Sequence, residues 1–283
     1  MKILQMAAVT PGPASAWLFL ADDGTLCVMD GGLEHHADQL WAALQHWGGQ
    51  NPHIRYWFLS HAHLDHCDAF LKLYARRGID FTLDELVYTF PASAAIDLYE
   101  PEYKDTIHSF EALAPAHIEP HVGDVFDLGC GARLHTLQVF SEEETGNLIN
   151  NSCTVWQLKT EGVSLLFLSD LGQDAGNRLL RAYGDRLKSD LVQMAHHGEN
   201  GVARPVYEAV QPDICLWDTP GWLWENTADP LRPGQGPWKT LETRRWMEEL
   251  GVETHAITKD GSWEICLCDH AAHITAYTGE ETP

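Results

Sequence analysis

Three histidines and one aspartate lie within six positions near the end of an apolar run, residues 56–59. They are His61, His63, Asp65 and His66. His61 and His63 are two positions apart, so in an extended chain their side chains point to the same side. Imidazole and carboxylate groups gathered in this way bind Zn, Mn or Fe. A run of exposed surface histidines is the alternative, but uncompensated polar groups are costly at the end of an apolar strand. The pattern therefore predicts a metal site.

Three other apolar strands of the sequence also end in potential ligands. These ligands are Asp30, Asp170 and the adjacent pair His196 and His197. Active sites of open α/β sheets gather at strand ends on one edge, so we expect these side chains to lie close together. The set predicts two metal ions, one held by His61 and His63 and the other by Asp65 and His66. Asp170 bridges the two ions in this prediction, and one histidine of the 196–197 pair completes the second site.

Strands and helices alternate in both halves of the sequence. A hairpin is predicted for 16–20 and 25–29, a strand for 85–90 and a closing pair of strands for 263–268 and 273–277. Apolar residues at helical spacing predict helices over 37–47, 93–114 with a break at Pro101, 177–186, 206–210 and 238–250. The order favours an α/β (α+β) fold in which two sheets are sandwiched by helices, with residues 1–283 forming one domain.

Composition narrows the class of protein. The formal net charge of −23 argues against a large nucleic-acid footprint, which needs basic surface. Seven cysteines without a CxxC motif are typical of reduced thiols rather than a disulfide framework. No apolar run approaches the roughly 20 residues of a membrane span, and residues 1–6 lack the apolar core of a signal peptide. We expect a cytoplasmic protein that does not bind membranes; the sequence leaves its oligomeric state open.

The segment His61-Ala62-His63-Leu64-Asp65-His66 matches the HxHxDH signature of the metallo-β-lactamase superfamily. Asp30, Asp170 and His197 follow the order of that family's other motifs. The resemblance implies a four-layer αββα sandwich, and it assigns His197 rather than His196 as the ligand. Within the superfamily, Asn150-Asn151-Ser152, Ser169-Asp170 and His196-His197-Gly198 resemble the hydrolase domain of DNA-uptake competence proteins and the bacterial phosphorylcholine esterases.

One departure from the superfamily pattern narrows the expected activity. β-Lactamases and glyoxalases place a further histidine between HxHxDH and the bridging aspartate. This sequence has Asn150-Asn151-Ser152 in that region, and His135 lies in an earlier predicted strand. The first ion would then have three protein ligands, with Asn150 nearby but outside the ligand set. This favours a phosphoesterase-like hydrolase with a small anionic substrate over hydrolysis of β-lactams or thioesters.

The expected mechanism uses two Zn ions, with Mn or Fe as alternatives, and a metal-bound hydroxide. Asp65 would orient or deprotonate the hydroxide, and Asp30 would orient His61 or His63 from behind. His196 would donate to a phosphoryl oxygen or protonate the leaving group, although a neutral histidine bonded only to backbone explains it equally well. Two other functions remain open: a di-iron oxidoreductase-like protein, and a non-catalytic protein that keeps the metal site.

Overall fold

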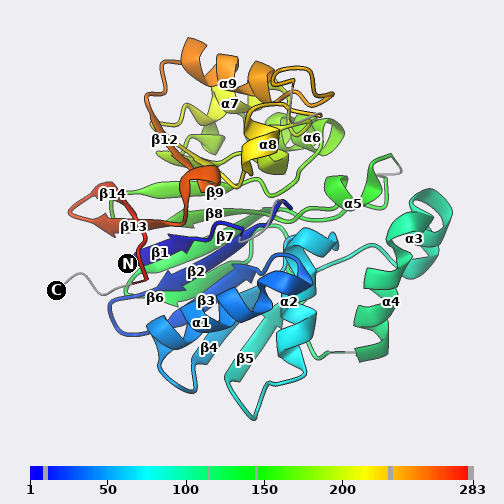
Figure 1. Ribbon diagram of the computed structural model, residues 1–283, viewed down its shortest axis with the longest axis vertical. Coiled ribbons are helices and arrows are strands. Elements are labelled where there is room, and N and C mark those ends of the chain that lie inside the picture. The colour runs from blue at the N-terminus through cyan, green and yellow to red at the C-terminus, as the bar shows by residue number, and fades with distance from the viewer. Residues whose placement is uncertain (9–11, 114, 144–145, 229–231, 280–283) are drawn as a thin grey trace.

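The strands of the protein form two sheets that lie face to face, with helices on their outer sides (Figure 1). The computed structural model describes residues 1–8, 12–113, 115–143, 146–228 and 232–279. Within these residues each sheet has seven strands. No helix in this part of the chain combines the length and apolar character that a membrane crossing requires.

The first sheet takes its strands from both ends of the chain, and the second takes them from the middle. In spatial order, the first contains β14 (Ala271–Ala276), β13 (Trp263–Cys268), β1 (Lys2–Gln5), β2 (Ala16–Leu20), β3 (Leu26–Asp30), β4 (His53–Phe58) and β5 (Thr82–Val87). The second contains β12 (Thr254–Ile257), β11 (Ile214–Trp217), β10 (Leu191–Gln193), β9 (Ser164–Phe167), β8 (Val155–Lys159), β7 (Ala132–Gln138) and β6 (Val125–Gly129). The first sheet therefore joins the amino-terminal strands to the last hairpin of the chain.

The helices that cover the first sheet come from the first half of the chain, and those that cover the second sheet come from the second half (Figure 1). The α-helices are α1 (Ala37–Gly48), α2 (Leu64–Tyr74), α3 (Ser93–Tyr99), α4 (Lys104–Leu113), α5 (Leu148–Asn151), α6 (Gln173–Tyr183), α7 (Arg204–Val210), α8 (Gly221–Trp224) and α9 (Thr240–Glu249). Single 3₁₀ turns are η1 (Glu34–His36), η2 (Pro101–Tyr103), η3 (Gly184–Leu187), η4 (Ala195–Gly198) and η5 (Thr258–Asp260).

Apolar clusters fill each gap between the layers. Between the sheets, the rings of Trp17 and Phe167 meet edge to face with centroids 5.3 Å apart. Trp57 packs on Phe70 of α2 at 5.0 Å, and Trp217 lies in the cluster beneath the helices of the second sheet. Burying each large apolar side chain contributes about 1.5–3 kcal/mol. The predicted αββα sandwich is confirmed.

Parallel pairing determines where the polar strand ends lie. β3, β4 and β5 run parallel in the first sheet, and β9, β10, β11 and β12 run parallel in the second. Carboxyl ends of parallel neighbours meet at one edge, so Asp30 comes beside the histidine segment and Asp170 beside the 196–197 pair.

Several predicted boundaries were displaced by tertiary contacts. β5 ends at Val87 rather than at residue 90, because the peptide nitrogen of Tyr88 donates to the carbonyl of Ile118 at 3.1 Å and the chain leaves the sheet. The predicted helix 177–186 begins earlier, at Gln173, where Asn151 Oδ1 accepts from the peptide nitrogen of Ala175 at 3.4 Å. The break at Pro101 is confirmed, and residue 114 lies outside the described residues.

Candidate metal centre

The histidine segment occupies the tight connection from β4 to α2. His61 is fully buried there, and His63 is partly exposed. The peptide nitrogens of His66 and Cys67 both donate to the carbonyl of His63 at 3.1 Å, which closes the first turn of α2. That turn carries His66 back beside His61, with ring centroids 4.2 Å apart.

Asp170 joins this segment to the second half of the chain. Its side chain is buried directly after β9. Asp170 Oδ2 lies 3.8 Å from His61 Nε2 and 3.5 Å from His197 Nε2, and Oδ1 lies 3.2 Å from His66 Nε2. The carboxylate therefore lies between nitrogen donors on both sides, as expected of a bridging group.

Two groups of potential ligand atoms share Asp170. Within each group the ligand atoms lie no more than 4.8 Å apart. The first group is His61, His63 and Asp170, and the second is Asp65, His66, Asp170 and His197. These coincide with the two sets predicted from the sequence. Among the described His, Cys, Asp and Glu residues the first group has three members, so the expected gap at the third histidine remains.

Unpaired buried atoms test whether these residues fit a metal ion. The Nε2 atoms of His61, His63 and His66 and Oδ1 of Asp170 are buried, and among the described residues none has a hydrogen-bond partner. The 3.2 Å approach of His66 Nε2 to Asp170 Oδ1 is close but lacks hydrogen-bond alignment. Each unpaired buried polar atom costs about 1–3 kcal/mol. One divalent ion in each ligand group would satisfy these atoms, so the donor set fits two ions.

In His61 and His197, the ring nitrogen opposite the candidate ligand atom already has a partner. His61 Nδ1 lies 3.0 Å from Ser60 Oγ, and His197 Nδ1 lies 2.8 Å from the carbonyl oxygen of Asp218. A histidine that donates from one nitrogen to an oxygen presents the other as a neutral ligand, which is the usual arrangement around bound metal.

Asp30 supports the site, but through a different histidine from the one we expected. Its Oδ2 lies 2.8 Å from His66 Nδ1, and it reaches His61 only through Ser60 Oγ, which donates to Oδ2 at 2.9 Å. The prediction that Asp30 orients His61 or His63 directly was wrong. The helical turn after His63 rotates the ring of His66, not those of the other two, toward the end of β3.

Ser60 and Ser169 connect the two strand ends, and the sequence reasoning missed both. Ser169 Oγ donates to Ser60 Oγ at 2.6 Å across the gap between the sheets. The peptide nitrogen of Thr154 donates to the carbonyl of Ser60 at 2.9 Å, and that of His196 to the carbonyl of Ser169 at 2.8 Å. Each serine directly precedes a ligand, and that position was the signal available in the sequence.

The charges of the cluster depend on one another. Burial raises the pKa of Asp170, but the charges of His197 and His66 outweigh burial and hold it well below its usual value. Burial lowers the pKa of His66, but Asp170, Asp30 and Asp65 outweigh it and raise the pKa well above 6.5. Burial dominates at His61, where a further contribution from His66 also lowers the pKa, so His61 is neutral.

The 196–197 pair adopts an unusual backbone that turns both rings toward the site. Both residues have positive φ, 52° at His196 and 53° at His197. Asp30 and Ser169, at the ends of two other strands of the site, also have positive φ. Strained conformations of this kind cost about 1–3 kcal/mol each and concentrate at functional sites. His197 Nε2 lies 2.9 Å from Asp65 Oδ2, whereas His196 Nε2 lies 3.7 Å from Asp170 Oδ2 and belongs to neither ligand group.

The remaining candidates lie outside the ligand groups. Asn150 is buried in α5, where its Nδ2 donates to Asn147 Oδ1 at 3.1 Å, so its place behind the first ion stays a prediction. His135 lies in β7 and belongs to neither group. Two further residues near the site were not anticipated: Glu199 Oε1 lies 3.5 Å from His196 Nε2, and the ring of Tyr103 lies 4.6 Å from that of His63.

Comparison with known proteins agrees with this geometry. The model of the metallo-β-lactamase superfamily matches residues 9–135. The first half of the chain is therefore similar in sequence to the metallo-β-lactamase superfamily. The superfamily match includes the whole histidine segment, and the second-half ligands Asp170 and His197 lie beyond it. A search of curated protein sequences finds no match.

Solved structures of the metallo-β-lactamase fold share the architecture of this chain. The metallo-β-lactamase fold protein YhfI from Bacillus subtilis is 13% identical, with a TM-score of 0.53 over 93% of this chain and 99% of that one. CmlA, a diiron β-hydroxylase from Streptomyces venezuelae, is 14% identical, with a TM-score of 0.53 over 90% of this chain. The match spans 52% of CmlA. At these identities the similarity shows the fold alone.

Proposed function

We propose that the protein is a metal-dependent hydrolase that cleaves a phosphoester in a small anionic substrate. The observation that carries this proposal is the pair of ligand groups that share Asp170. When bound, two divalent ions activate water near neutral pH and stabilise charge on both the attacking and the leaving oxygen. In-line displacement at phosphorus uses both effects, and the sparse first group agrees with the departure from the β-lactamase pattern.

Asp65 and Asp170 keep the centre negatively charged. Burial raises the pKa of Asp65, but His66 and His197 outweigh burial and lower it to about 2. Asp65 is therefore an ionised acceptor at neutral pH, and its Oδ2 already accepts from His197 Nε2 at 2.9 Å. In the proposed reaction this carboxylate orients the attacking water, and the neighbouring carboxylate of Asp170 holds the two ligand groups together.

His196 is suited to act on the leaving group. Its side chain is 20% exposed, whereas those of His61 and His66 are fully buried. Because it belongs to neither ligand group, its Nε2 stays available for proton transfer. We assign His196 the role of donating a proton to the leaving oxygen, with Glu199 beside it at 3.5 Å.

Metal analysis combined with an activity assay tests the proposal. Metal-free protein would be loaded with Zn, Mn or Fe and assayed with bis(p-nitrophenyl) phosphate, a β-lactam and a thioester. We expect bound metal and turnover of the phosphodiester, and loss of both in Asp170→Asn. His61→Ala should lower the metal content, whereas His121→Ala is the matched control because its side chain is 78% exposed and lies outside the ligand groups.

Other outcomes would identify the competing functions. Imidazole and carboxylate ligands also suit iron. Bound iron with oxygen-dependent redox activity and no ester turnover would support an oxidoreductase. Stoichiometric metal without turnover of any ester class would support a non-catalytic protein. Unchanged metal content in His61→Ala would show that the site has been misplaced.

A further inference from the structure

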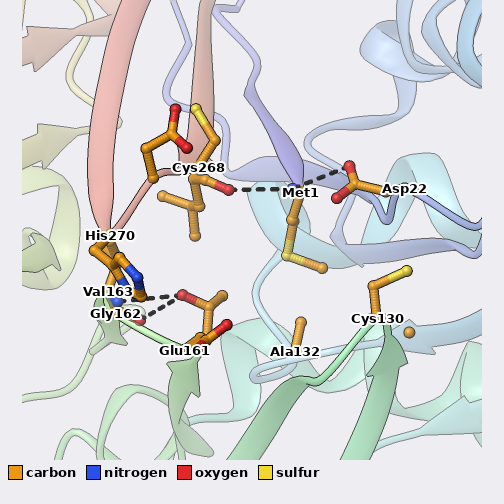
Figure 2. Close-up of a pocket in the computed structure, with 13 residues that line it drawn as sticks. Met1, Asp22, Cys130, Ala132, Glu161, Gly162, Val163, Cys268 and His270 are labelled. Atoms are coloured by element: carbon orange, nitrogen blue, oxygen red, sulfur yellow. Dashed lines mark hydrogen bonds and ion pairs between the residues drawn. The ribbon is translucent and has the colours of Figure 1, made fainter.

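The edge of the sandwich opposite the metal centre holds a cavity of about 380 Å³ (Figure 2). β3 and β9 begin at this edge and end at the metal centre, so the two regions lie at opposite ends of the same strands. Turns of both sheets surround the cavity, and Met1, Cys130, Cys268 and His270 are among its lining residues. The exposed thiol of Cys268 is therefore accessible to small molecules.

Cys268 has a second thiol beside it. Cys266 Sγ donates a hydrogen bond to Cys268 Sγ at 3.3 Å. The two residues are two apart in β13, so they share one face of the strand, while Ile265 and Leu267 point into the core. Cys266 is half-buried and Cys268 is exposed. The strand thus presents a thiol pair, not two unrelated cysteines.

We propose that Cys266 and Cys268 form a redox-active dithiol that a peroxide oxidises reversibly to a disulfide. The thiolate of Cys268 attacks one peroxide oxygen, which forms a sulfenic acid and releases hydroxide. Cys266 then attacks the sulfenic sulfur, the S–S bond forms and water leaves. In sum, two thiols lose two protons and two electrons, and one hydrogen peroxide becomes two waters.

The hydrogen bond indicates which thiol reacts first. Burial raises the pKa of Cys266, and its hydrogen bond to Cys268 raises it further. Cys266 therefore keeps its proton and stabilises negative charge on Cys268, the more exposed sulfur. Exposure and thiolate character together control the reactivity of a thiol with peroxides.

The strand geometry explains why the disulfide would be easily reduced. Residues two apart in a strand have Cα atoms about 6.6 Å apart, from the rise per residue. Disulfides usually span about 4.4–6.8 Å, so this one would form near the upper limit and under strain. Strained, exposed disulfides are the readily reduced kind.

The other cysteines lack these features. Cys27, Cys67, Cys153 and Cys215 are buried, and burial raises the pKa of each thiol. Cys130 is exposed, and its thiol interacts with Asp23, but among the described residues no other cysteine sulfur is bonded to it. It is therefore a matched control, being an exposed thiol at the same cavity without an adjacent one.

Peptide mapping after oxidation tests the proposal. Trypsin cleaves after Lys259, and no Lys or Arg follows, so residues 260–283 leave as one peptide that contains both cysteines and no other. After treatment with hydrogen peroxide and alkylation, we expect this peptide unalkylated and two hydrogen masses lighter than the dithiol. Excess glutathione should restore two alkylation sites. Cys266→Ser should accumulate a sulfenic acid at Cys268 that dimedone labels, and Cys130→Ser should leave the peptide's oxidation unchanged.

Three results would overturn the proposal. The first is that Cys266 and Cys268 are both still alkylated, and therefore still reduced, at a peroxide dose that already oxidises Cys130. The second is a Cys268 disulfide to a different cysteine or to another molecule. The third is disulfide formation at the same rate in urea-unfolded protein, because the folded geometry would then contribute nothing.

Discussion

Replacing Asp30 by asparagine tests how the centre is held from behind. Asp30 accepts from the peptide nitrogen of Ser60 at 2.8 Å and from its hydroxyl at 2.9 Å, and its Oδ2 lies 2.8 Å from His66 Nδ1. An asparagine can still accept from the peptide nitrogen of Ser60. Its amide NH₂ then faces His66 Nδ1 and requires that nitrogen to be an acceptor. His66 would carry its proton on Nε2, the nitrogen that faces the second ligand group.

The expected effect is a selective loss of metal affinity. Removing the partner of a metal-binding histidine typically costs 10- to 100-fold in affinity, or about 1.4–2.8 kcal/mol. The loss should fall on one of the two metal equivalents, because His66 belongs to the second ligand group alone. Loss of buried charge-assisted hydrogen bonds should also lower the stability of the metal-free protein by about 1–3 kcal/mol.

Competition with a chromophoric chelator measures both affinities, and chemical unfolding measures the stability. Asp190→Asn is the control: Asp190 Oδ2 accepts from the peptide nitrogen of Ser164 at 2.7 Å and from its hydroxyl at 2.8 Å, away from the metal centre. The control should lose stability while keeping its metal affinity. If Asp30→Asn binds both equivalents as tightly as the wild type, or if Asp190→Asn loses as much affinity, the reasoning fails.

Further predictions concern protons, backbone and bound metal. Burial lowers the pKa of His197, but the carboxylates, Asp170 first, outweigh it and raise the pKa from 6.5 to about 9. In metal-free protein this proton contributes stability that is fully present below pH 6.5 and is lost as the pH rises through 9. Metal binding must release the proton, so metal affinity should rise toward pH 9. Calorimetry in two buffers should detect the released proton. Gly198→Ala should lower Tm and metal affinity, because a Cβ there would lie 2.4 Å from the ring of Trp217 in addition to requiring φ of +82°. Gly251→Ala, at φ +78° with open space around it, should cost about 1–2 kcal/mol in stability and no metal affinity; equal losses in the two variants would rule out the steric explanation. Chelation with EDTA should lower Tm. Where free metal had stood at 100 times its Kd, the free energy of unfolding should fall by about 2.7 kcal/mol, and an unchanged Tm would contradict a metal-binding native state.

Local spacing in the sequence was enough to predict most of the ligand set. His61 and His63 lie on one side of an extended segment, and Asp65 and His66 begin a helix, so their convergence depends on neighbouring dihedral angles alone. The ends of apolar strands identified Asp170 in the same way. The layered fold also followed from the order of strands and helices, because each apolar face must be buried against another element.

Tertiary structure decided which groups support the ligands. The contact of Asp30 with His66 depends on the register of β3 against β4 and on a positive φ that no spacing rule predicts. The link between Ser60 and Ser169 joins residues 109 positions apart across two sheets. Such contacts are set by the packing of whole elements, so they become visible only when the layers are assembled.

One feature of the thiol pair follows from the sequence, and two others follow from the folded structure. Alternation along β13 places Cys266 and Cys268 on one face, and the sequence contains that fact. Their 3.3 Å contact and the cavity beside Cys268 arise from the turns of two sheets meeting at one edge. The sequence by itself therefore determined the candidate ligand residues and the layers that carry them. The folded structure decided which neighbours hold those residues in place, because that depends on side-chain packing between segments far apart in the chain.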